Sequence, residues 1–159
     1  MLLSRSAENL YWANRYVERA ETISRLLDVG YRISLLPNYS STHKSEWESI
    51  LLSAGSFDGY RLKYNEFNQK NISDYLLFDN ENKSSVINCM KAARNNIRSA
   101  RTRVTNDVWL SFNQSYKTFQ KYKKKAYKTE NLPVLCNSIK QETNLLRGAI
   151  ENTQLENDG

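Results

Sequence analysis

The chain of 159 residues has few of the residues that punctuate β-structure, with only five glycines and two prolines. This scarcity argues against a turn-rich all-β protein. No apolar run approaches the roughly 20 residues that a membrane-spanning helix needs. Residues 1–12 include Arg5 and Glu8 and no apolar core segment, which argues against a cleaved secretory signal. We therefore expect a protein that makes no membrane contact.

Histidine and cysteine are also scarce, which limits the chemistry that the chain can perform. The single histidine, His43, falls in a polar link, and no Cys, His, Asp or Glu grouping has metal-ligand spacing. There is no glycine-rich phosphate loop and no identifiable Ser, His and Asp set. Cys89 and Cys136 lie far apart on apolar stripes, and we interpret them as reduced core residues of a cytoplasmic protein. The sequence thus predicts no metal and no cofactor, and it identifies no catalytic residue.

The length and apolar content that remain are sufficient for one globular domain, which we place at residues 1–159. Hydrophobic residues make up 40% of the chain and charged residues 25%, as in ordinary globular proteins. The net charge of +6 and the pI near 9.3 favour acidic partners.

The spacing of apolar residues predicts helices along the whole chain. A long first helix covers residues 5–35 and ends before Pro37, and short helices follow from Ser45 and over residues 71–78. Ser84 or Ser85 caps the next helix, whose apolar stripe has a 4-3-4-3-4 spacing typical of a bundle. That stripe consists of Val86, Met90, Ala93, Ile97, Ala100 and Val104.

Two further amphipathic stretches complete the predicted fold. One is an aromatic stripe formed by Trp109, Phe112, Tyr116 and Phe119. The other is a last helix with Pro133 in its first turn and an aliphatic face of Leu132, Leu135, Ile139, Leu146 and Ile150. We therefore expect an all-α fold, a helical bundle of four or five principal helices with a long first helix.

One half of the first helix collects polar and aromatic residues, and we interpret it as the inward face. At 100° per residue this face carries Arg5, Glu8, Asn9, Trp12, Arg15, Tyr16, Arg19, Ile23, Leu26 and Leu27. The opposite face, interpreted as solvent-exposed, carries Tyr11, Asn14, Glu18, Glu21, Arg25, Asp28 and Arg32. Because a buried charge is costly unless it is paired, the inward face predicts a satisfied polar cluster.

That cluster has two interpretations. It is either a site in which guanidinium groups hold a phosphate or carboxylate ligand, or a buried network that pairs Arg19 or Arg15 with Glu8 and Glu142. In the network we expect Arg19 to be buried and bonded to Glu8 or Glu142, and Glu18 to face solvent. The candidate ligand- or partner-binding residues are Arg5, Glu8, Asn9, Trp12, Arg15, Tyr16, Glu18, Arg19 and Glu142.

Two basic features lie later in the chain. Lys91, Arg94, Arg98 and Arg101 form a stripe beside the apolar seam, which we interpret as flanking residues that pair with carboxylates. A basic run with two tyrosines follows, formed by Lys121, Tyr122, Lys123, Lys124, Lys125, Tyr127 and Lys128. It is either a contact for nucleic-acid phosphates or, as we favour, a solvated helix end.

The opening of the chain resembles the bacterial alpha-E family, a helical domain named for its Glu-Arg motif, which is Glu18-Arg19 here. The resemblance rests on LSRSAENLYW at residues 3–12, NRYVERAE at residues 14–21 and RLLD at residues 25–28. It continues through AARNNIR at residues 92–98, and through Arg101, Trp109, Asn113 and residues 146–153.

This resemblance implies a place beside ATP-grasp proteins and transglutaminase-like proteins in a system that forms amide or peptide bonds. Members of the family usually have Glu where Asn95 stands, and are usually about twice as long, with a second Glu-Arg helix. The chain therefore looks like an amino-terminal half or a truncated member. We expect the aromatic stripe or the aliphatic face of the last helix to be left uncovered, and hence a homodimer or a second chain that supplies the missing half.

Three functions follow as expectations. The first is a non-catalytic partner or scaffold of an ATP-grasp-type ligase system. The second is an enzyme of that pathway whose polar pocket lies on the first helix. The third is a basic nucleic-acid-binding module, although no nucleic-acid-binding motif accompanies the basic run.

Overall fold

The computed structural model describes residues 2–37, 43–125 and 127–158, with the backbone alone described for residues 2–3, 43–44 and 154–158. Helices and turns account for the regular structure of these ranges, and no strand occurs in them. The helices are α1 (Leu2–Ser34), α2 (His43–Ser53), α3 (Phe57–Lys63), α4 (Gln69–Phe78), α5 (Val86–Ser99), α6 (Asn106–Lys124) and α7 (Leu132–Asp158), with short 3-10 helices at Arg101–Arg103 and Thr129–Asn131. The prediction of an all-α fold with a long first helix is confirmed.

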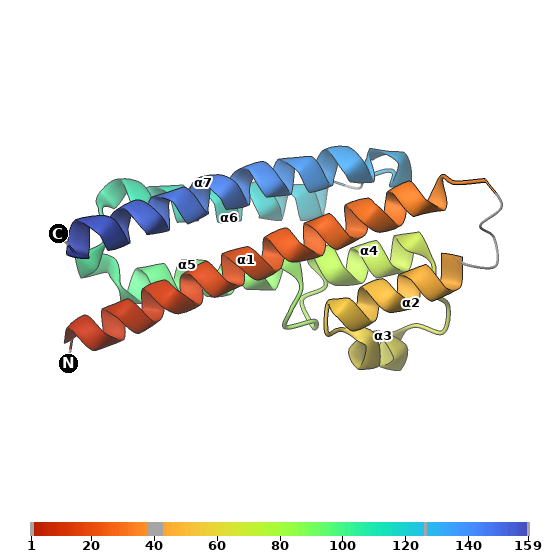
Figure 1. The fold of residues 1–159 in the computed structure, drawn as a ribbon, viewed down its shortest axis with the longest axis horizontal. Helices are drawn as coiled ribbons and strands as arrows, with labels where there is room; N and C mark the ends of the chain where they lie inside the picture. The colour runs from red at the N-terminus through yellow and green to blue at the C-terminus, as the bar shows by residue number, and fades with distance from the viewer. Residues whose placement is uncertain (1, 38–42, 126, 159) are drawn as a thin grey trace.

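Four long helices form the bundle, and three short ones lie beside it (Figure 1). α1 packs against α5 and α7, while α6 packs against the same two helices and closes the ring. α2 and α4 pack against the second half of α1, and α3 packs on α2. The first half of α1 consequently has bundle helices on one side and solvent on the other, which decides the role of its side chains.

Several helix boundaries follow local signals in the sequence. Ser85 caps α5, because its hydroxyl accepts the backbone N–H of Asn88 at 3.3 Å. Thr105 caps α6 by accepting the backbone N–H of Val108 at 3.3 Å. Pro133 occupies the first turn of α7, where its missing N–H costs nothing. These start signals were readable without the structure.

The predicted seam on α5 is buried against its neighbours. Val86, Met90, Ala93, Ile97 and Ala100 are fully buried, and Val104, beyond the end of the helix, is partly buried. The buried side chains of α1 include the small residues Ala13, Val17, Ala20 and Ser24, together with Leu10, Ile23 and Leu27. Small side chains at a helix contact allow the two helix axes to lie closer together. The α1–α5 contact therefore rests on small residues of α1 and on the apolar stripe of α5.

The faces that we expected to lack cover are covered by the chain itself. Phe112 and Phe119 of α6 and Ile139 and Leu146 of α7 are buried, while Trp109, Tyr116 and Leu135 are half-buried. These four helices bury their own apolar faces because they close into a ring. The expectation of an uncovered face was therefore wrong for these stripes, and the expectation of a dimer loses that basis.

α2 is fixed against α1 by two glycines. Gly30 is buried in α1, and a Cβ there would collide with the side chains of Trp47 and Ile50 of α2. Gly55 ends α2 with a φ of 69°, and the backbone N–H of Ser56 donates to Leu51 at 2.9 Å, as in a Schellman motif. α2 begins at His43 rather than at Ser45 as predicted. Its end is thus held beside the middle of α1.

Candidate functional site at the Glu-Arg segment of helix α1

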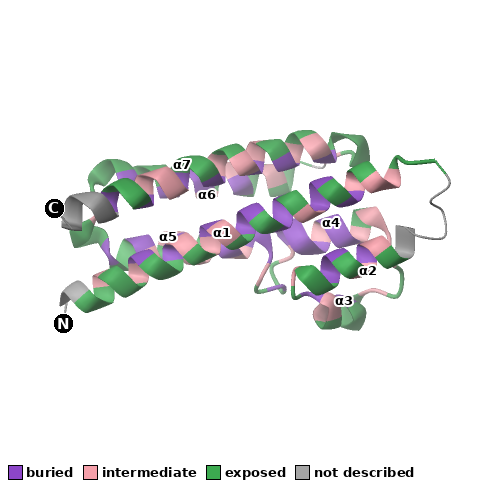
Figure 2. Ribbon diagram, viewed as in Figure 1, coloured by how far each residue is buried: buried purple, intermediate pink, exposed green. Residues whose placement is uncertain are grey.

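The predicted inward face of α1 is the outer face over the first half of the helix. Arg5, Glu8, Trp12, Arg15 and Arg19 are exposed, and Trp12 keeps 44% of its surface accessible. Asn9 and Tyr16 are half-buried. These residues do share one face, which we call the outer stripe and define as Arg5, Glu8, Trp12, Arg15, Tyr16 and Arg19. The alternation of exposed and buried residues along α1 is visible in Figure 2.

The small residues of α1 explain this correction. The prediction placed Trp12 and Tyr16 inside because large aromatic side chains usually lie in cores. Ala13, Val17 and Ala20 instead occupy the bundle side, since α5 and α7 both approach α1 there. Their 4-3 spacing was a signal available in the sequence.

The acid that α1 buries most completely is Glu21, which was expected to face solvent. Its side chain is 5% exposed and lies between two arginines. Arg147 of α7 donates Nη1–H to one carboxylate oxygen at 2.6 Å, and Arg25 donates to the other at 2.6 Å. Burial alone would raise the pKa of Glu21, but the hydrogen bonds from Arg147 and Arg25 and their positive charges hold it below the ordinary value.

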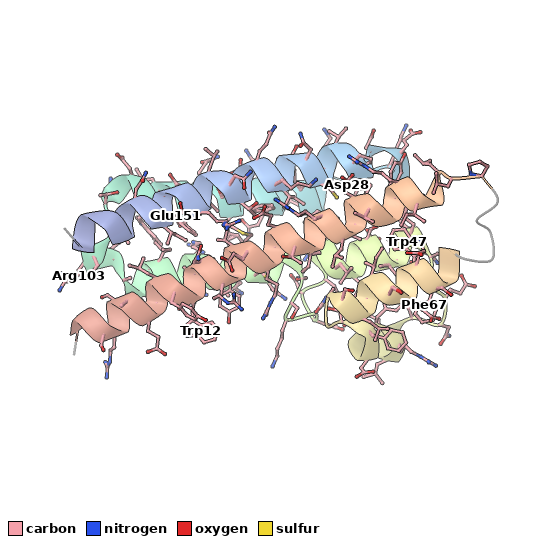
Figure 3. All side chains as sticks on the ribbon, in the orientation of Figure 1. Trp12, Asp28, Trp47, Phe67, Arg103 and Glu151 are labelled. Carbon is pink, nitrogen blue, oxygen red and sulfur yellow. The ribbon has the colours of Figure 1, made fainter. Side chains whose placement is uncertain are left out.

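Asp28 repeats this arrangement two turns further along α1. It was also expected to face solvent, but it is buried. Lys140 of α7 lies 3.4 Å from its carboxylate and Arg32 lies 3.3 Å from it. Figure 3 shows Asp28 on the side of α1 toward α7, and Trp12 on the opposite side. The charged network that the sequence predicted therefore exists, but it joins α1 to α7 through different residues.

Glu18 lies at the boundary between this network and the outer stripe. It is half-buried rather than solvent-facing as predicted. Its carboxylate accepts hydrogen bonds from Asn14 at 3.3 Å and from Arg15 at 3.2 Å, and Arg147 lies 3.9 Å away. Glu18 therefore touches both sides of α1.

Arg19, next to Glu18, lines a pocket instead of a closed ion pair. The pocket has a volume of about 480 Å³ and is bounded by α1, by the end of α2 and by Ser84. Its walls comprise Arg15, Glu18, Arg19, Thr22, Ile23, Ser53, Ala54, Gly55 and Ser84. The Arg19 guanidinium lies 5.9 Å from the Tyr16 ring, and no carboxylate in the described part of the chain pairs with it. The predicted bond from Arg19 to Glu8 or Glu142 is therefore wrong.

The Glu18-Arg19 pair connects this pocket to known proteins. The chain matches, over residues 2–159, a family described as a predicted alpha-helical domain with a conserved ER motif and called Alpha-E. The chain belongs to the Alpha-E family. Glu18-Arg19 is the only Glu-Arg dipeptide in its sequence. No curated protein and no solved structure matches the chain.

The motif of this Alpha-E chain thus stands at the mouth of a pocket, with the glutamate tied to neighbouring side chains and the arginine open to a ligand. The exposed guanidinium groups of Arg15 and Arg19 can bind a carboxylate or a phosphate through paired N–H donors. Thr22, Ser53 and Ser84 line the same space. Within the described ranges no helix is long and apolar enough to cross a membrane, and no group of acids, histidines and cysteines is placed to hold a metal ion.

Glu142, a further candidate, does not join the other site residues. It lies on α7 facing α6, where the Ser115 hydroxyl donates to its carboxylate at 2.6 Å. There it lines a separate pocket with Leu110 and Leu145. Glu142 is half-buried inside the apolar arc of the last helix, and the bond from Ser115 supplies its carboxylate with a donor there.

The secondary basic stripe packs on aromatic rings and amides rather than on carboxylates as predicted. Arg94 donates to the Asn113 side chain at 2.7 Å, and its guanidinium lies 5.3 Å from the Tyr116 ring. Arg101 lies 5.1 Å from the Trp109 ring. Arg98 is exposed. Arg94 and Arg101 therefore help to join α5 to α6, and cation–π contact takes the place of ion pairing.

The residues that sequence reasoning missed are the cross-helix partners Glu21, Asp28, Lys140 and Arg147. Glu21 with Arg25, and Asp28 with Arg32, have the i,i+4 spacing of ordinary solvent-exposed pairs. Nothing local marks them as buried, because Arg147 lies 126 residues after Glu21.

Proposed function

We propose that this Alpha-E domain is a non-catalytic partner protein that binds another protein through the outer stripe of α1 and the pocket beside it. The observation that carries the proposal is the exposure of Trp12, Arg15 and Arg19 on one face, beside the half-buried Tyr16. Tryptophan, tyrosine and arginine are the residue types that dominate binding energy at protein interfaces. The bundle leaves Trp12 exposed. A partner that covers Trp12 would account for this exposed apolar surface.

The charges of this surface favour an acidic partner segment. Arg19 has no carboxylate partner in the part of the chain that the structure describes, and Arg15 pairs only with its own neighbour Glu18. The deeper acids Glu21 and Asp28 are already paired with cations from α1 and α7. A carboxylate from a partner can therefore bind Arg19 without displacing an internal ion pair. The net charge of +6 supports the same choice of partner.

The resemblance stated above supports a partner in an ATP-grasp-type amide or peptide ligase system, either the ATP-grasp-type protein itself or a transglutaminase-like protein. A second copy of the chain that docks on this surface is the alternative partner. We place the protein in the cytoplasm, and its two buried free thiols support that placement.

The test is a binding measurement with the purified ATP-grasp-type protein of the same organism. Trp12→Ala and Arg19→Ala should each weaken binding roughly 30-fold, the size of an interface hot spot. Arg32→Ala is the matched control, because it removes an exposed cation of α1 outside the stripe while Asp28 keeps Lys140. Equal affinities for the parent, Trp12→Ala and Arg19→Ala would contradict the proposal.

A second candidate is an enzyme of the same system, which the open pocket around Glu18 favours. The two functions differ in what Glu18→Gln does. In a scaffold, the variant changes turnover of the reconstituted ligase system only as far as it changes binding. In an enzyme, it abolishes turnover while the complex still forms.

A further inference from the structure

We propose that a lysine-walled pocket at the end of α6 binds the phosphate groups of a ligand that carries two or more of them. The pocket has a volume of about 550 Å³ and lies between the end of α3, α4, the turn at residues 79–81 and the end of α6. Its cationic walls are Lys63, Lys70, Lys123, Lys124 and Lys125. This site is separate from the outer stripe and does not depend on the function proposed there.

Two of these lysines are already paired. Lys63 lies 2.7 Å from the carboxylate of Asp79 and 3.6 Å from that of Glu81. Lys70 lies 3.1 Å from Asp74. The pocket therefore contains three carboxylates, each within 4 Å of one of these two ammonium groups.

The other three lysines supply the binding charge. Lys123, Lys124 and Lys125 are exposed, and no carboxylate in the described ranges forms an ion pair with them. With five lysines and three acids in the walls, the pocket has an excess of two positive charges. These three side chains also stand at the carboxyl end of α6, where the helix dipole favours cations. The excess of two positive charges matches a ligand that carries two or more negative charges.

The walls behind these lysines are held by hydrogen bonds. The Tyr127 hydroxyl donates to Asp74 at 2.8 Å, and the Lys70 ammonium lies 4.6 Å from the Tyr127 ring. Asp79 also accepts the backbone N–H of Glu81 at 2.8 Å. Burial would raise the pKa of Asp79, but the Lys63 bond and this N–H hold it below its ordinary value. The positive charge of Lys123 also lowers the pKa of Asp79, although Lys123 forms no ion pair with it in the described ranges.

Phosphate is the chemistry that fits best. Lysine ammonium groups are compact charges that bind phosphate oxygens without the planar geometry that arginine requires. The pocket is also lined by the rings of Tyr64, Phe78 and Tyr127, which can contact the organic part of a ligand. Lys121 and Lys128, at the two ends of the basic run, do not line the pocket. This confined arrangement favours a small phosphorylated ligand over a nucleic-acid strand, which would follow the whole run.

The test is isothermal titration with inorganic tripolyphosphate at about 150 mM salt, where exposed charges are screened beyond about 8 Å. The parent should bind one tripolyphosphate per chain. The triple variant Lys123→Gln, Lys124→Gln, Lys125→Gln should bind at least about tenfold more weakly, through loss of its charge-assisted contacts. Lys91→Gln, Lys117→Gln, Lys121→Gln is the matched control, because it removes the same charge from exposed lysines outside the pocket. It should stay within about twofold of the parent.

Failure of the parent to bind tripolyphosphate would overturn the proposal, and so would equal weakening of binding by both triple variants. A third contrary result is tighter binding of a single-stranded oligonucleotide without a terminal phosphate than of tripolyphosphate, with that binding weakened by both triple variants. The last result would assign the basic run to nucleic acid. Parallel titrations with a free nucleoside triphosphate and with vesicles containing a phosphoinositide bisphosphate identify the source of the phosphates. The site is supported if the pocket variant binds either of these ligands more weakly than the parent while the control variant binds it as the parent does.

Discussion

On the side of α1 that faces α7, Glu21 and Asp28 each contact two cationic side chains, whereas on the outer side Arg19 has no carboxylate partner in the described residues. The two sides carry the same kinds of residue within two turns of one helix. The difference follows from burial, because a charge removed from water must be paired and an exposed one need not be. Removing one partner on the paired side should therefore destabilise the fold, whereas the unpaired side is the one that we propose for binding.

The largest effect expected from this comparison is at Arg147. Arg147→Ala would leave the buried Glu21 with Arg25 alone, and should lower the free energy of unfolding by about 3 kcal/mol. Arg25→Ala is the control, because it contacts the same carboxylate from a side chain that is 65% exposed. Arg25→Ala should lower the free energy of unfolding by less than about 1 kcal/mol. Equal losses in urea denaturation would show that the contact between α1 and α7 does not depend on this cross-helix pair.

The next effect concerns the packing of α2 on α1, because the end of α2 lines the pocket beside Glu18 and Arg19. Gly30→Ala should destabilise the protein by about 2 kcal/mol, because the added methyl group overpacks the contact with Trp47 and Ile50. Gly148→Ala is the matched helical control, since its methyl group would meet no atom within 4 Å. It should stabilise α7 by roughly 0.5–1 kcal/mol through helix propensity. Loss of stability in both variants would contradict the close approach of α2.

A smaller effect should appear as a pH dependence. The pKa of Glu21 lies below its ordinary value of 4.5 in the folded chain. Its contribution to stability is therefore complete above the pKa of the unfolded chain and is lost as the pH falls through the folded-state pKa. The gap in stability between the parent and Glu21→Gln should be widest near neutral pH and shrink under acid. Glu151→Gln, at an exposed acid of α7, should show no such gap.

The sequence was sufficient for the four long helices, for α2 and for α4, but it missed α3 at Phe57–Lys63 and the orientation of α1. The Ser85 cap, the apolar stripe of α5 and Pro133 are local signals, and each predicted its element. The orientation of α1 depends on which helices approach it, and Ala13, Val17 and Ala20 competed with Trp12 and Tyr16 for the buried side. The contact between Glu21 and Arg147 joins residues 126 positions apart, so no periodicity within one helix could reveal it.

The most direct test of the difference between the two sides of α1 compares Arg19→Ala with Arg147→Ala in one denaturation series. Because Arg19 is exposed and has no ion pair in the described ranges, Arg19→Ala should change the free energy of unfolding by no more than about 0.5 kcal/mol. Arg147→Ala should lose about 3 kcal/mol in the same series. A loss of several kcal/mol in Arg19→Ala, or an unchanged Arg147→Ala, would contradict the assignment of the inner side to stability and the outer side to binding.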